Sequence, residues 1–141
     1  AEFPFRKVIG VEMNENLASI AERNVAQWSL IERPQARIRI MPQDAAEFEW
    51  PHTPLLVYLY NPFEHALVEQ VTSQLATAAA SGAGLVDLLY VNPTCADTLS
   101  RQGIFKLLWS ALIQMDEADQ LADPYGTSSD RVSLYRYRTT R

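Results

Sequence analysis

The stretch KVIGVEMNENLASIAERN, residues 7–24, predicts the start of an α/β fold. Residues 7–13 form a short apolar run that ends at an acidic residue, Glu12. Continuous apolarity is typical of a parallel strand that is covered on both faces. Asn14 can cap the next element, and from Leu17 onward apolar side chains recur at helical spacing. A buried strand followed by an amphipathic helix is the repeating unit of such folds.

The rest of the chain continues this alternation and predicts one domain over residues 1–141. Asn-Pro pairs at Asn61 and Asn92 predict two further helix starts, with asparagine as the cap and proline in the first turn. We expect a three-layer α/β/α sandwich, with a mostly parallel sheet and a C-terminal antiparallel hairpin. The expected strands are residues 7–13, 36–41, 55–60, 85–91, 105–113 and 132–137.

Composition narrows the classes of partner. The chain has 141 residues, 48% of them hydrophobic, and a net charge of −5, which argues against a nucleic-acid-binding surface. No apolar run approaches the roughly 20 residues of a membrane helix. One cysteine, Cys95, allows no internal disulfide, and we expect a buried side chain there and a cytoplasmic protein. His52 and His65 have no second ligand at metal spacing, so we expect no metal site.

Three polar positions follow predicted strands, and each has two interpretations. Glu12 can accept hydrogen bonds from ribose hydroxyls, or it can favour a helix start through the helix dipole. Asp44 can bond the exocyclic amine of adenine, or cap a short turn. Asn61 can orient a substrate amine or hydroxyl, or serve only as the helix cap. Each residue alone leaves both interpretations open.

The joint order of these segments resembles one known family. VIGVEMNENLASIAERN is followed by DAAEF and then by VYLYNPF, ending at residue 63. This pattern resembles the class I, Rossmann-like S-adenosylmethionine-dependent methyltransferases, and more closely a bacterial subset of them. The resemblance covers most of residues 5–93. The first block is fairly specific, the NPF moderately so, and DAAEF is weak.

The resemblance implies a cofactor site and a substrate site. Glu12 would hold the ribose hydroxyls, and Met13 would pack against the adenine. Asp44 would bind the adenine amine, and Ala45 would line the ring. Related amine methyltransferases carry a (D/N)-P-P-(Y/F) motif where this chain has one proline fewer. The candidate substrate-site residues at that position are Asn61, Pro62 and Phe63.

The family's glycine-rich loop and the strand before it have no counterpart in the 141 residues. The resemblance therefore implies an N-terminally truncated domain that keeps only the adenosine half of the cofactor site. In the family the missing strand lies centrally, between the strands that end at Glu12 and Tyr60, and its loss would leave two unpaired edges. The two strands could pair directly, a second copy could fill the gap in a homo-oligomer, or the chain could be a fragment.

Three functions remain open at this point. The first is a methyltransferase-like domain with an unknown methyl acceptor, active only if the missing segment is supplied. The second is a non-catalytic remnant that serves as a binding or self-association module. The third is another Rossmann-like nucleotide binder, such as a dehydrogenase fragment, although the predicted closing hairpin favours the first.

Overall fold

The computed structural model describes residues 5–31, 36–60, 63–122 and 126–138. The chain divides into two compact units, residues 1–49 and residues 50–141, each with most of its contacts inside itself. Each unit is described by itself, and the single domain expected over residues 1–141 stays a prediction. Within the described residues, no helix is long and apolar enough to cross a membrane.

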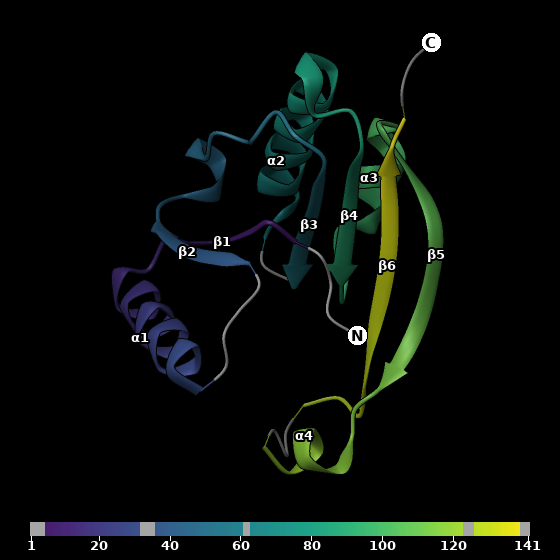
Figure 1. Ribbon diagram of the computed structural model, residues 1–141. Coiled ribbons are helices and arrows are strands. Elements are labelled where there is room, and N and C mark those ends of the chain that lie inside the picture. The colour runs from purple at the N-terminus through teal and green to yellow at the C-terminus, as the bar shows by residue number, and fades with distance from the viewer. Residues whose placement is uncertain (1–4, 32–35, 61–62, 123–125, 139–141) are drawn as a thin grey trace. The chain divides into compact units, whose positions relative to one another are not determined.

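The first unit is a parallel strand pair joined by a helix (Figure 1). Strands β1 and β2 pair in parallel from Lys7↔Arg37 to Glu12↔Pro42. Helix α1 connects them and packs mainly along β2. This is a β-α-β crossover, the connection that parallel neighbours require. Its elements are β1 (Lys7–Glu12), α1 (Glu15–Ile31), β2 (Arg37–Pro42) and a short 3-10 turn, η1 (Ala45–Glu47).

Helix α1 begins as the sequence predicts. The side-chain Oδ1 of Asn14 accepts hydrogen bonds from the backbone N–H groups of Asn16 and Leu17, at 3.0 and 3.2 Å. Ala18 is buried, but Leu17 and Trp28 remain 51% and 41% exposed. Helical spacing predicts an amphipathic helix, but here it does not tell which of the apolar side chains are buried in the unit.

The second unit is a four-stranded mixed sheet in the order β3-β4-β6-β5. The β3–β4 pair is parallel, and β6 is antiparallel to both β4 and β5. Figure 1 shows α2 and α3 on the same side of this sheet. Its elements are β3 (Leu55–Tyr60), α2 (His65–Ala78), a π-helical turn η2 (Ala79–Ala83), β4 (Val86–Val91), α3 (Ala96–Gln102), β5 (Phe105–Gln114), α4 (Glu117–Ala122) and β6 (Ser129–Tyr137).

The two faces of this sheet differ in burial. On β3, Val57 and Leu59 are buried, whereas Tyr58 and Tyr60 on the opposite face are 60% and 51% exposed. A strand alternates its side chains between the two faces, so one face is covered and the other is open. The covered core is built from side chains of the sheet and of α2 and α3: Val57, Leu59, Val68, Val71, Leu75, Val86, Leu88, Tyr90, Leu99, Phe105 and Tyr135.

The α/β class, the strand positions and the closing antiparallel hairpin are confirmed. The described strands form two sheets, and no described strand pairs with β1 or β3 on the side away from β2 or β4. Whether β1 and β3 pair directly stays a prediction, because the two strands belong to different units.

The predicted helix start at Asn92 is wrong, and the one at Asn61-Pro62 falls on residues outside the described ones. Helix α2 begins at His65 after Glu64, whose extended backbone (φ −73°, ψ 165°) ends the non-helical segment and whose side chain makes no cap bond. Helix α3 begins at Ala96, and Asn92 has a positive φ of 47°, outside the helical region. Its side chain bonds across to β6 instead. Long-range contacts override the local signal here. Helix α4 lies between the two strands of the closing hairpin.

Candidate functional site

The carboxyl ends of β1 and β2 form one edge of the first unit. Glu12 and Pro42 are register partners, and the Gln43 N–H donates to the Glu12 carbonyl at 3.1 Å. Asp44 follows two residues after Pro42, so its carboxylate belongs to the same edge as that of Glu12. In open α/β sheets, ligands bind outside the carboxyl ends of the strands. The edge is therefore placed where a nucleotide ligand would bind.

The Glu12 carboxylate makes one hydrogen bond to the nearby backbone. Its Oε1 accepts a hydrogen bond from the Asn14 N–H at 2.7 Å, at the entrance to α1. The residue is half-buried, and its Oε2 accepts no hydrogen bond from the described residues. Met13, next in the chain, is 70% exposed. The edge thus offers one carboxylate oxygen in a fixed orientation and an apolar side chain beside it.

Asp44 is held in the same way. Its Oδ1 accepts from the Ala46 N–H at 2.8 Å and caps the turn η1, which confirms the capping interpretation. Gln43 closes the loop by donating from Nε2 to the Glu47 carbonyl at 2.8 Å. Asp44 and Ala45 are half-buried, and Asp44 Oδ2 accepts no hydrogen bond within the described part of the chain. Capping fixes the carboxylate without using both oxygens.

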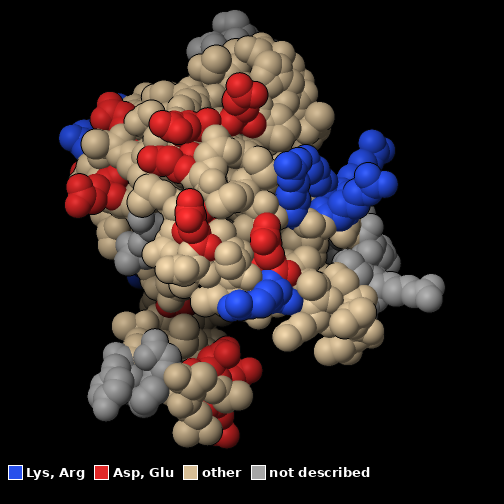
Figure 2. Space-filling view, turned by 90° about the vertical axis from the view of Figure 1, so that its left-hand side faces the viewer, with Lys and Arg blue, Asp and Glu red and all other residues tan. Residues whose placement is uncertain are grey.

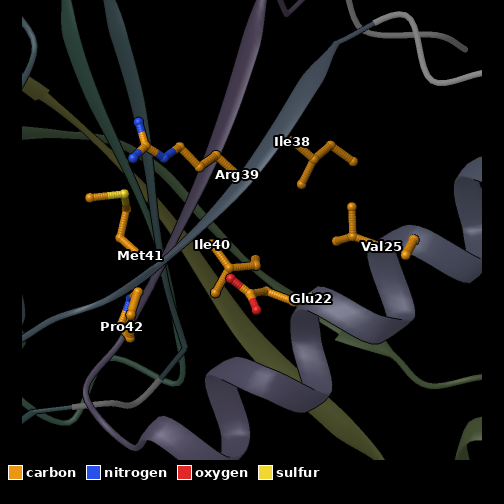
Figure 3. A pocket seen from close by; sticks show the side chains of 8 residues that line it. Glu22, Val25, Ile38, Arg39, Ile40, Met41 and Pro42 are labelled. Carbon is orange, nitrogen blue, oxygen red and sulfur yellow. The ribbon is translucent and has the colours of Figure 1, made fainter.

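A separate open hollow of about 490 Å³ lies between α1 and β2 (Figure 3). Neither Glu12 nor Asp44 lines it, although it ends at Pro42, close to their edge. It is lined by Glu22, Val25, Ala26, Ile38, Arg39, Ile40, Met41 and Pro42.

The predicted substrate residues belong to the second unit. Asn61 and Pro62 lie outside the described residues, so the structure does not place them. Phe63 is half-buried, and its carbonyl accepts a hydrogen bond from the Cys95 thiol at 3.4 Å. Cys95 is 3% exposed, which confirms the expectation of a buried side chain. This contact ties the segment after β3 to the segment after β4.

A polar cluster beside Phe63 was not predicted from the sequence. His65 Nδ1 lies 2.8 Å from the Thr98 hydroxyl and 3.5 Å from Asp97 Oδ1. Arg101 donates to the Thr98 hydroxyl at 3.2 Å and pairs with Asp97 at 3.5 Å. The cluster joins the first turn of α2 to α3. Among the described residues, no three His, Cys, Asp or Glu side chains gather closely enough to hold a metal ion.

The fold has known counterparts, although no protein-family model and no curated protein matches the sequence. The structure matches a candidate methyltransferase from Thermoplasma acidophilum with a TM-score of 0.63 at 14% identity, over 94% of this chain. It also matches the N-methyltransferase NodS from Bradyrhizobium japonicum, bound to S-adenosyl-L-homocysteine, with a TM-score of 0.58 at 8% identity, over 93% of this chain. The chain has a Rossmann-like methyltransferase fold.

A candidate methylase from Haemophilus influenzae matches with a TM-score of 0.53 at 18% identity, over 94% of this chain. The chain spans 73, 66 and 58% of the lengths of the Haemophilus, Bradyrhizobium and Thermoplasma proteins. In this methyltransferase fold, the edge that carries Glu12 and Asp44 is the carboxyl edge of a parallel pair. At such low sequence identity, the methyl acceptors of these proteins are not assigned to this chain.

Charged side chains lie on the surface, whereas the core of the second unit holds a buried tyrosine hydroxyl. Figure 2 shows acidic side chains spread over much of one face, with basic side chains in smaller groups. Inside the second unit, burial raises the pKa of the Tyr90 hydroxyl above its ordinary value of 10.0. That hydroxyl is buried, and no described group meets strict hydrogen-bond geometry with it, although Thr94 and Cys95 lie close enough to affect its pKa. Tyr90 therefore stays protonated at neutral pH and adds no charge to the core.

Proposed function

We propose that the chain binds the adenosine half of S-adenosylmethionine at the carboxyl edge of β1 and β2. Glu12 would accept hydrogen bonds from the ribose hydroxyls, and Asp44 would accept one from the adenine amine. Met13 and Ala45 would contact the ring. The observation that carries the proposal is the parallel register: it puts both carboxylates at one edge, each with an oxygen left over from its local hydrogen bond.

Methyl transfer is a separate requirement from adenosine recognition. Methyl transfer needs the sulfonium aligned with a nucleophile more than it needs covalent help from the enzyme. No G-x-G turn follows a strand in these 141 residues, so no glycine-rich loop is at hand to position the methionine end. We therefore propose adenosine recognition by this chain, with methyl transfer only when that loop is supplied.

Calorimetric titration with S-adenosylhomocysteine tests the proposal. We expect micromolar binding, with adenosine competing and methionine not competing. The variants Glu12→Gln and Asp44→Asn keep the oxygens that accept from Asn14 and Ala46, so the loops stay in place. Each removes a charge-assisted hydrogen bond to the ligand, which weakens binding about tenfold.

The controls are Glu15→Gln and Glu47→Gln, each three residues from its matched carboxylate. Both are exposed and make no side-chain contact in the proposed site, so binding should not change. Absence of binding at millimolar ligand contradicts the proposal, as does equal weakening by the controls.

The second candidate is a self-association module. Two observations favour it: no described strand of the second unit pairs with the outer edge of β3, and Leu56, Tyr58 and Tyr60 on β3 are exposed. Unpaired edges invite strand pairing. Light scattering decides: a dimer at micromolar concentration that Tyr58→Glu converts to a monomer supports this candidate, and a monomer at all concentrations contradicts it.

A further inference from the structure

The outer edge of β2 carries unused backbone hydrogen-bonding groups. The Arg37 N–H donates to the Arg6 carbonyl at 3.4 Å, and the Gln43 N–H donates to the Glu12 carbonyl. Backbone groups alternate in direction along a strand. The N–H and C=O groups of odd-numbered residues in β2 therefore point toward β1, and those of even-numbered residues point away from it. The N–H groups of Ile38 and Ile40 therefore point outward, and no described residue accepts from them. Pro42 has no N–H and ends the series.

The hollow of about 490 Å³ runs along this free edge. Figure 3 shows Ile38 and Ile40 on the side of α1, near Val25 and Glu22, and Arg39 with Met41 on the other side of the strand. An added strand would place alternate side chains on these two sides. One set would meet the apolar wall of α1, and the other would meet arginine.

Charge determines which strand fits. Arg37 and Arg39 are both exposed on one side of β2, so acidic side chains are favoured there. Glu22 lies on the other side, so acidic side chains are disfavoured next to α1. The two sides thus fix the register of an added strand, because a slip by one residue exchanges its two sets of side chains. Pairing with a second copy of β2 is disfavoured for the same reason, because the arginines of the two copies would lie opposite one another.

We propose that the β2 edge and the α1–β2 hollow together bind an extended peptide of alternating apolar and acidic residues, which adds a third strand beside β2. The backbone bonds to Ile38 and Ile40 supply affinity, and the two arginines supply selectivity, as in other cases of strand addition. The inference is independent of the cofactor site, because neither Glu12 nor Asp44 takes part.

The probe is an acetylated, amidated peptide of alternating valine and glutamate, added to the full ¹⁵N-labelled chain at 0.15 M salt, where the chain's net negative charge is largely screened at long range. We expect amide shifts confined to β2 and the facing side of α1, with slower hydrogen exchange at Ile38 and Ile40. The same peptide with every backbone nitrogen methylated should not bind, because it lacks the N–H donors that would pair with the carbonyls of the β2 edge.

A charge exchange tests selectivity. Arg37→Glu combined with Arg39→Glu should weaken the valine–glutamate peptide about tenfold, since exposed ion pairs each contribute up to about 1 kcal/mol. The same variant should gain binding to a valine–lysine peptide. The control Arg23→Glu, on the exposed surface of α1, should leave both affinities unchanged.

Three results overturn the proposal. The first is equal binding of the N-methylated peptide, which shows that the strand edge is not used. The second is an unchanged preference in the charge-exchanged variant. The third is concentration-dependent shifts at Ile38 and Ile40 without peptide, which assigns the edge to a second copy of the chain.

Discussion

Replacement of Tyr90 by phenylalanine should stabilise the protein. Tyr90 is fully buried on β4, and no described group meets strict hydrogen-bond geometry with its hydroxyl, although Thr94 and Cys95 lie close enough to affect its pKa. A buried hydroxyl without a partner costs about 1 to 3 kcal/mol. Removal of one oxygen leaves a void of atomic size, which costs about 0.3 kcal/mol. The expected net gain for Tyr90→Phe is about 1 kcal/mol in the free energy of unfolding.

The gain should grow at high pH. Burial raises the pKa of folded Tyr90 above its ordinary value of 10.0, whereas the unfolded residue titrates near that value. The unfolded state therefore loses its proton first, and the wild type loses stability as the pH rises above 10. The variant lacks this loss, while the raised pKa values of Tyr58 and Tyr135 are common to both proteins.

Urea unfolding at pH 7 and at pH 10.5 measures both effects, and a gain of about 1 kcal/mol corresponds to about 3 to 4 °C in Tm. The matched control at pH 7 is Tyr58→Phe, because Tyr58 is 60% exposed and its replacement should change stability there by less than about 0.5 kcal/mol. Destabilisation of Tyr90→Phe by 1 kcal/mol or more refutes the reasoning, since it shows that the hydroxyl has a partner.

Three further variants test other features by urea unfolding. Gly103→Ala should cost about 1 kcal/mol, because φ is +64° and the added Cβ meets no atom within 4 Å, so only the backbone is strained; no change contradicts the assigned conformation. Asn92→Ala should cost about 2 to 3 kcal/mol, through loss of the bonds to Asp130 (2.7 Å) and to the Arg131 N–H (3.0 Å) at a positive φ; under 1 kcal/mol contradicts it. Leu99 is 1% exposed, so Leu99→Ala should lower the free energy of unfolding by about 2 to 5 kcal/mol and leave its dependence on urea concentration unchanged. A cost under about 1 kcal/mol contradicts the assigned burial.

Strand positions and the first helix cap were predictable because they rest on local chemistry. The apolar run of β1 and the asparagine at position 14 act within a few residues, and both behave as expected. The alternation of residues 132–137 likewise predicts β6. Such patterns persist because the sheet and the cap use neighbouring groups.

The contacts that join distant segments were not predictable. Cys95 lies 32 residues from Phe63, and Thr98 lies 33 from His65. No spacing rule relates such pairs, so the polar cluster became visible only in the structure. The failed helix start at Asn92 has the same cause: an Asn-Pro pair is a local signal, whereas the Asn92 side chain bonds to Asp130 and Arg131, 38 and 39 residues away.

The edge formed by Glu12 and Asp44 was predictable from the order of the segments, and its ligand stays a proposal. The carboxyl ends of consecutive parallel strands meet at one edge, so a correct assignment of β1 and β2 fixes the relative position of both carboxylates. The sequence could not show that each carboxylate also holds a local backbone N–H. That detail leaves one oxygen of each for a ligand.

The most direct test of the central claim is an NMR measurement of contacts between bound S-adenosylhomocysteine and the full chain. The account predicts nuclear Overhauser effects from the adenine protons to the methyl groups of Met13 and Ala45. Adenine contacts confined to the α1–β2 hollow or to Phe63 would contradict it.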